Sequence, residues 1–116
     1  MAGAGDAFDY KIFFAAGSDE VRPESAAILD ELAEELAEHP EAIGIRVVGH
    51  VDRTEDGELS KRRADAVAAA LRKRGVSQRL HARGAGAGEG RPSCTDDPEL
   101  CLARSRRVEF VVVVSE

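Results

Sequence analysis

Two residues of opposite charge lie where an apolar stretch passes into a predicted helix. Asp52 follows the apolar residues 43–48, and Arg63 lies in the first turn of a helix that the sequence predicts over residues 60–74. A carboxylate can hold an ammonium group, and the planar guanidinium of arginine can hold a carboxylate through two parallel hydrogen bonds. The pattern therefore indicates a binding site for a small zwitterion rather than a reaction centre.

The simpler interpretation is that Asp52 and Arg63 pair only with each other or with solvent. Surface ion pairs are common and contribute about 0–1 kcal/mol. Because sequence spacing does not show that two side chains meet, spacing by itself favours this interpretation. The start of the helix gives one argument for a ligand site, since its unpaired backbone N–H groups favour an anion.

Other candidates for chemistry are weaker. His50 precedes Asp52 by two residues, so both could face one side of a strand and suggest a metal ligand or a base. No third ligand and no nucleophile motif lies nearby in sequence, which favours a structural histidine. The glycine-rich residues 84–90 match neither a dinucleotide-binding motif nor a P-loop. We therefore expect no catalytic residue, no metal site and no cofactor.

Length and composition narrow the function classes. The 116 residues fit one compact domain, predicted over 1–116 with residues 1–9 as an N-terminal extension. Aromatic residues make up 4 % and Trp is absent, which argues against an exposed stacking surface for bases or sugars. The net charge of −6 argues against nucleic acid as a partner. No run of about 18 apolar residues is present, so we expect no direct membrane insertion by this domain.

Hydrophobic periodicity predicts six elements in the order β-α-β-α-β-loop-β. Four apolar runs have the length of strands and lie at 10–14, 43–48, 80–83 and 107–114. The last of them is apolar on both faces and should lie centrally in the sheet. Helices are predicted from Pro23 to a stop at His39, and from an N-cap at Ser60 to a stop at Gly75. The expected fold class is α/β, as an α+β two-layer sandwich with both helices on one face of a small mixed sheet.

Two cysteines, Cys94 and Cys101, lie in a predicted flexible loop over residues 84–104. With no histidine nearby in sequence, they cannot complete a four-ligand zinc site. A disulfide that closes the loop is favoured over two free thiols. Such a bond would place the domain in an oxidising compartment.

Five short motifs occur along the chain in the order found in one protein family. They are Gly49-His50-Val51-Asp52, Leu59-Ser60-x-x-Arg63-Ala64-x-x-Val67, Gly75-Val76, Gly86-Ala87-Gly88-Glu89 and Arg106-Arg107-Val108-Glu109. In this order they resemble the OmpA C-terminal-like domains of the bacterial envelope, over residues 12–114.

The resemblance implies non-covalent binding of peptidoglycan through the diaminopimelate residue of its stem peptide, which would anchor a parent envelope protein to the cell wall. Asp52 and Arg63 match the principal ligands of that family, and Leu59 and Arg107 are expected to add secondary contacts. The cysteine pair resembles that of some outer-membrane members. We therefore expect a periplasmic domain of a larger exported protein, with its attachment and oligomeric state left open.

Three departures from the family pattern support an alternative. The loop between Asp52 and Leu59 is shorter than usual and lacks a Tyr-Asn pair, and Val51 replaces a common Thr. The first strand ends in Phe14-Ala15-Ala16-Gly17 where the family often has Phe-Asp-Phe-Asp. A domain that keeps the fold but has lost wall binding would serve as a protein-interaction or oligomerisation module. A cell-wall hydrolase ranks third, because no catalytic constellation supports it.

Overall fold

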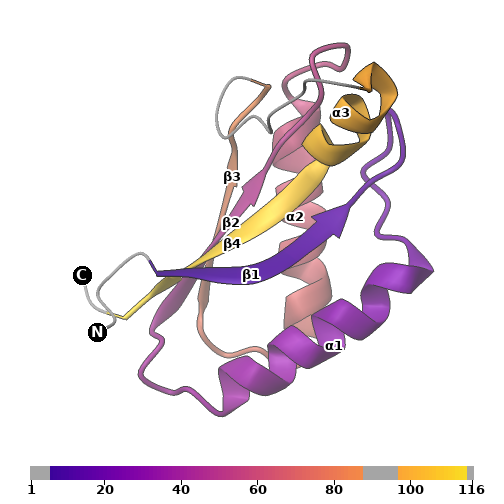
Figure 1. Cartoon of the computed structure of the whole chain (residues 1–116). Helices are drawn as coiled ribbons and strands as arrows, with labels where there is room; N and C mark the ends of the chain where they lie inside the picture. The colour runs from indigo at the N-terminus through magenta and orange to yellow at the C-terminus, as the bar shows by residue number, and fades with distance from the viewer. Residues whose placement is uncertain (1–5, 88–96, 115–116) are drawn as a thin grey trace.

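The computed structural model describes residues 6–87 and 97–114, which form a four-stranded sheet and three helices (Figure 1). In chain order the elements are β1 (Asp6–Phe13), α1 (Pro23–Ala37), β2 (Gly44–Gly49), α2 (Leu59–Lys73), β3 (Arg79–Gly84), α3 (Pro98–Ser105) and β4 (Arg107–Val113). The strand order across the sheet is β1-β4-β2-β3. The expected two-layer α+β architecture is confirmed.

Strand β4 occupies a central place in the sheet, as its apolar sequence predicted. It pairs antiparallel with both β1 and β2, whereas β2 and β3 are parallel neighbours joined through α2. Side chains alternate across a sheet, so Val108, Phe110 and Val112 point to the same face of β4. All three are buried in the core.

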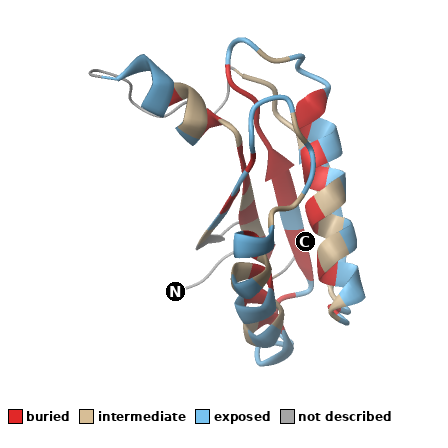
Figure 2. Ribbon diagram, turned by 90° about the vertical axis from the view of Figure 1, so that its right-hand side faces the viewer, coloured by how far each residue is buried: buried red, intermediate tan, exposed pale blue. Residues whose placement is uncertain are grey.

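The core lies between this face of the sheet and the helices α1 and α2 (Figure 2). Each helix contributes an apolar stripe at intervals of three and four residues, and the fully buried members are Leu29, Leu32, Leu36, Ala64, Val67 and Leu71. The outer surface of α1 carries acids such as Asp30 and Glu34 instead. Aliphatic residues thus fill a core in which aromatic side chains are few.

The two long helices begin and end close to the predicted residues, with one correction. Helix α1 has Pro23 in its first turn, and Gly75 ends α2 with a φ of 84°, a left-handed conformation that glycine adopts without strain. Ser60, however, is not the N-cap of α2. The helix begins at Leu59, and the Ser60 hydroxyl donates back to Gly57 O at 2.7 Å, because the short preceding loop already turns helically.

Both ends of the fold carry more regular structure than the sequence indicated. Strand β1 begins at Asp6, inside the expected extension over residues 1–9. The loop expected over 84–104 contains α3, in which Asp97 accepts hydrogen bonds from the N–H groups of Glu99 and Leu100. Cys101 is buried on α3, whereas Cys94 lies outside the described residues, so the disulfide stays a prediction.

Among the residues that the structure describes, no helix is both long enough and apolar enough to cross a membrane.

Candidate functional site

The candidate site lies at the end of the sheet where β1 and β2 finish and where α2 and β4 begin (Figure 1). Two glycines allow the first turn of α2 to sit directly on the strand ends. A Cβ atom on Gly49 would lie 1.9 Å from Ser60 O, and a Cβ atom on Gly84 would lie 2.5 Å from Ser60 Oγ. The Gly49 of the Gly-His-Val-Asp motif therefore sets the position of the helix that carries Arg63.

Arg63 lies in the first turns of α2 and has an exposed fraction of 0 %. Its Nε donates to Ser18 O at 2.8 Å, and its Nη1 and Nη2 donate to His50 O at 3.0 Å and Ala15 O at 3.2 Å. Nη1 and Nη2 also donate to the two carboxylate oxygens of Glu55, at 2.8 and 2.7 Å. A guanidinium has five N–H donors, and each of those on Arg63 has an acceptor within the chain.

Glu55 is the partner that the sequence analysis did not single out. Its carboxylate, 5 % exposed, accepts from Arg63 and from the backbone N–H groups of Gly17 at 2.8 Å and Asp52 at 3.0 Å. Burial opposes its charged form, but the hydrogen bonds from Arg63, Gly17 and Asp52 outweigh burial and hold the pKa of Glu55 below its ordinary value. The Glu55 carboxylate is therefore ionised at neutral pH.

Asp52 is buried just beyond the end of β2. One carboxylate oxygen accepts from Thr54 N at 2.8 Å and Thr54 Oγ1 at 2.6 Å, and the other accepts from Arg106 Nη1 at 3.1 Å. Burial raises the pKa of Asp52, and the hydrogen bonds from Thr54 and Arg106 more than offset it, so the net pKa is lowered. Arg106 also donates to Phe14 O, and its side chain is 17 % exposed.

Asp52 and Arg63 thus belong to one network but do not bond directly to each other. The network, defined here as the charged network, consists of Asp52, Glu55, Arg63 and Arg106. Its two ion pairs are joined by the Asp52 N–H, which donates to Glu55. The simple Asp52–Arg63 ion pair is not what forms. Each residue has an internal partner of opposite charge, a carboxylate for the arginine and a guanidinium for the aspartate.

The two expected secondary residues lie in different surroundings. Leu59 is buried at the first position of α2, one turn before Arg63 and on the same side of the helix. Arg107 lies on the face of β4 opposite to Val108 and the core, where its Nε pairs with Glu109 at 2.7 Å. Arg106, which sequence reasoning ranked below Arg107, is the member of the basic cluster that contacts Asp52.

His50 is buried, and its backbone carbonyl accepts from Arg63. Within residues 6–87 and 97–114, no group of three His, Cys, Asp or Glu side chains is arranged to hold a metal ion. Hydrogen bonds hold the first residues of the glycine segment in place: Ala85 N donates to Gly49 O, and Gly86 N donates to Ser60 Oγ. Its first residues therefore help to hold the strand end against α2.

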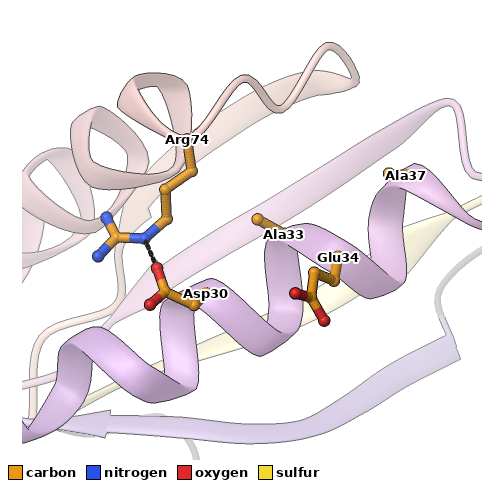
Figure 3. Close-up of a pocket in the computed structure, with 5 residues that line it drawn as sticks. All are labelled: Asp30, Ala33, Glu34, Ala37 and Arg74. Atoms are coloured by element: carbon orange, nitrogen blue, oxygen red, sulfur yellow. Dashed lines mark hydrogen bonds and ion pairs between the residues drawn. The ribbon is translucent and has the colours of Figure 1, made fainter.

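A surface hollow of about 430 Å³ lies between α1 and the last turn of α2 (Figure 3). Asp30, Ala33, Glu34 and Ala37 of α1 line it, together with Arg74 at the far end of α2. Arg74 Nε donates to Asp30 Oδ1 at 2.7 Å across it. Since α2 rises about 1.5 Å per residue, the hollow and the charged network mark opposite ends of this helix.

Comparison with known proteins identifies the class to which this fold and this site belong. The OmpA family model matches residues 13–99, so the chain belongs to the OmpA family. The chain is 41 % identical over 83 residues to a peptidoglycan-associated lipoprotein from Legionella pneumophila, and the match covers 68 % of the chain and 46 % of that protein. The chain thus spans about half the length of this curated relative.

Solved structures agree with the family assignment. The peptidoglycan-associated lipoprotein from Burkholderia pseudomallei has a TM-score of 0.73 at 28 % identity, with 88 % of each chain covered. The cell wall anchor of the T6SS from Pseudomonas aeruginosa has a TM-score of 0.74 at 27 % identity, with 97 % of this chain and 89 % of that chain covered. The periplasmic domain of MotB has a TM-score of 0.79 at 21 % identity, which shows the shared fold.

Proposed function

We propose that this chain is a non-enzymatic module that binds peptidoglycan without a covalent bond and anchors its parent protein to the bacterial cell wall. Membership of the OmpA family supports this function, as do the similar peptidoglycan-associated lipoproteins and the similar cell wall anchor. The observation that carries the proposal is the buried guanidinium of Arg63, whose Nη1 and Nη2 already hold one carboxylate, that of Glu55, through two parallel hydrogen bonds.

The ligand in this proposal is the diaminopimelate residue of the stem peptide. Its free end carries an ammonium and a carboxylate on one carbon, and the charged network offers the Asp52 carboxylate for the first and the Arg63 guanidinium for the second. The ligand ammonium takes the place of the Arg106 guanidinium on Asp52, and the ligand carboxylate takes the place of the Glu55 carboxylate on Arg63. Leu59 packs beside the ligand, and Arg107 acts at longer range from the other face of β4.

The proposed location is the periplasm, within a larger exported protein of the cell envelope. A disulfide between Cys94 and Cys101 fits this compartment. Mass spectrometry after alkylation without a reductant tests it, because a disulfide leaves both cysteines unalkylated. Alkylation of both thiols in protein purified from the periplasm would contradict this part of the proposal.

Sedimentation with purified sacculi tests the function. Wild-type protein should pellet, and Asp52→Asn should stay in the supernatant because an amide cannot balance the ligand ammonium. Asp56→Asn makes the same chemical change at an exposed residue of the same loop and should pellet like the wild type. Failure of the wild type to pellet would contradict wall binding, and pelleting of Asp52→Asn would remove Asp52 from the site.

A second function, a protein-interaction or oligomerisation module, is favoured by one observation. All five N–H donors of Arg63 are used within the chain, so its guanidinium needs no ligand to be satisfied. In that case the protein should stay in the supernatant with sacculi and should form a dimer or larger species in analytical ultracentrifugation. A monomer that pellets with sacculi would exclude this second function.

A further inference from the structure

The carboxylate of Glu55 contacts Arg63 through two parallel bonds, from Nη1 to Oε1 at 2.8 Å and from Nη2 to Oε2 at 2.7 Å. An external carboxylate bound at an arginine fork adopts the same arrangement. We propose that Glu55 competes with the ligand carboxylate for Arg63. In the free domain Glu55 occupies the Arg63 guanidinium, and this competition sets the affinity for the ligand. This inference rests on the proposed function and adds the residue that regulates the site.

The loop that carries Glu55 is built to bring this side chain back to the arginine. Thr54 N donates to Asp52 Oδ1, and Glu55 N donates to Asp52 O, so the chain reverses immediately after Asp52. The reversal brings Glu55, three residues beyond Asp52, onto the Arg63 fork. The reversal after Asp52 thus accounts for the position of the internal carboxylate.

The same loop can move without a large loss of apolar contact. Between Val51 and Leu59, which are both buried, most residues are exposed, and the carboxylates of Asp52 and Glu55 are anchored inside. No hydrophobic side chain lies between these two residues in the sequence. Segments with few buried apolar contacts open at low free-energy cost. Polar contacts, those of Glu55 among them, therefore hold the part of the loop beyond Asp52.

The exchange of one carboxylate for another is nearly balanced. Glu55 accepts from Arg63, Gly17 N and Asp52 N, and a ligand carboxylate in the same place can accept from the same donors. The ligand therefore gains at Arg63 only what Glu55 gives up. The ligand ammonium likewise displaces Arg106 from Asp52, so affinity in the wild type must come mainly from the rest of the ligand. Removal of Glu55 should leave the Arg63 donors without an internal competitor and so raise the affinity.

Calorimetric titration with a soluble, diaminopimelate-containing stem peptide tests the inference. Glu55→Gln should bind the peptide about tenfold more tightly than the wild type, because a neutral amide competes poorly for a guanidinium. Glu58→Gln removes the same charge from an exposed residue of the same loop and should leave the affinity within about twofold of the wild type.

A second measurement does not depend on peptidoglycan. Acetate should raise the Tm of Glu55→Ala relative to chloride at equal ionic strength, because acetate can fill the vacated fork, and it should not do so for the wild type or for Glu58→Gln. If Glu55→Ala does not fold in chloride, recovery of its folded signal in acetate is the same result.

The outcomes separate the two proposals. Binding of the stem peptide by the wild type that Glu55→Gln does not improve would overturn the competitor role and leave the proposed function intact. Absence of binding by both proteins would overturn the proposed function and this inference with it. Tighter binding by Glu55→Gln, together with stabilisation of Glu55→Ala by acetate, supports both.

Discussion

The two ends of helix α2 each carry an arginine paired with a carboxylate, yet the two pairs differ in almost every physical respect. At the beginning of the helix, Arg63 and Glu55 have side chains exposed by 0 % and 5 % and are saturated with hydrogen bonds. At the end of the helix, Arg74 and Asp30 are exposed by 25 % and 66 % across a shallow hollow. The same pair of charged groups is thus a fixed part of the interior at one end and a solvated surface contact at the other.

Burial, and not the presence of an ion pair, decides how much stability is lost when one partner is removed. A buried arginine that loses its carboxylate leaves an uncompensated charge in a medium of low polarity. An exposed arginine that loses its carboxylate turns to water instead.

Removal of the buried carboxylate should have the largest effect. Glu55→Ala should lower the free energy of unfolding by about 3–5 kcal/mol, because it leaves Arg63 buried without its counter-charge. Asp30→Ala at the other end of α2 should lower it by about 0–1 kcal/mol. Urea unfolding at neutral pH in chloride buffer measures both values. Equal losses in the two variants would show that burial does not separate the two pairs.

The close packing beneath the buried pair gives the next effect. Gly49→Ala should lower the free energy of unfolding by about 3 kcal/mol, because the added Cβ would overlap Ser60 O and push the first turn of α2 away from the sheet. Gly57→Ala is the matched control. Its Cβ would meet nothing within 4 Å, so its stability should change by less than about 1 kcal/mol. A stable Gly49→Ala protein would contradict the close approach of α2 to β2.

Acid should weaken the buried ion pairs at the beginning of α2 more than the exposed ion pair at its end. The pKa values of Glu55 and Asp52 are lower in the folded protein than their ordinary values of 4.5 and 3.8. A carboxyl whose pKa is depressed on folding stabilises the protein above its unfolded pKa, and this contribution is lost as the pH falls through the folded pKa. Stability should therefore fall below about pH 4. Chemical denaturation at several pH values should give a shallower acid dependence for Glu55→Gln than for Asp30→Asn.

A half-buried contact on α1 provides the smallest effect and an intermediate case. The Tyr10 hydroxyl donates to Glu35 Oε1 at 2.7 Å, and this hydrogen bond, with burial and the nearby acids, raises the pKa of Tyr10 to about 12. Tyr10 is the one tyrosine of the chain, so absorbance near the tyrosinate band reports it alone. Glu35→Gln should lower the midpoint toward 10, and an unchanged midpoint would mean that Glu35 does not hold the hydroxyl.

Most of the fold could be predicted from the sequence because its elements depend on local patterns. The apolar stripe of α1, the glycine after α2 and the apolar last strand each indicate a structure whose cause lies within a few residues. Helix α3 was missed because it has only eight residues and follows a glycine-rich stretch. The N-cap of α2 was misplaced by two residues, since the turn at Asp56–Leu59 depends on the length of the loop.

The site was predictable only in part, because its contacts join distant segments. Asp52 and Arg63 were found from their types and places, but no local pattern shows that Glu55 folds back onto Arg63 across a reversal of the chain. The choice of Arg107 over Arg106 failed to anticipate the contact between Arg106 and Asp52, which are separated by 54 residues. The short loop that follows Asp52 was the available signal, since a connection that brief restricts where an acidic side chain can go.

The backbone N–H of Gly17 can report on the state of the charged network. This amide donates to Glu55 at 2.8 Å and so fastens the connection between β1 and α1 to the connection between β2 and α2. Solvent exchange of this one proton should be slowed while the glutamate remains in place. The exchange rate at Gly17 therefore reports, in a single NMR signal and without added ligand, how often the arginine is uncovered.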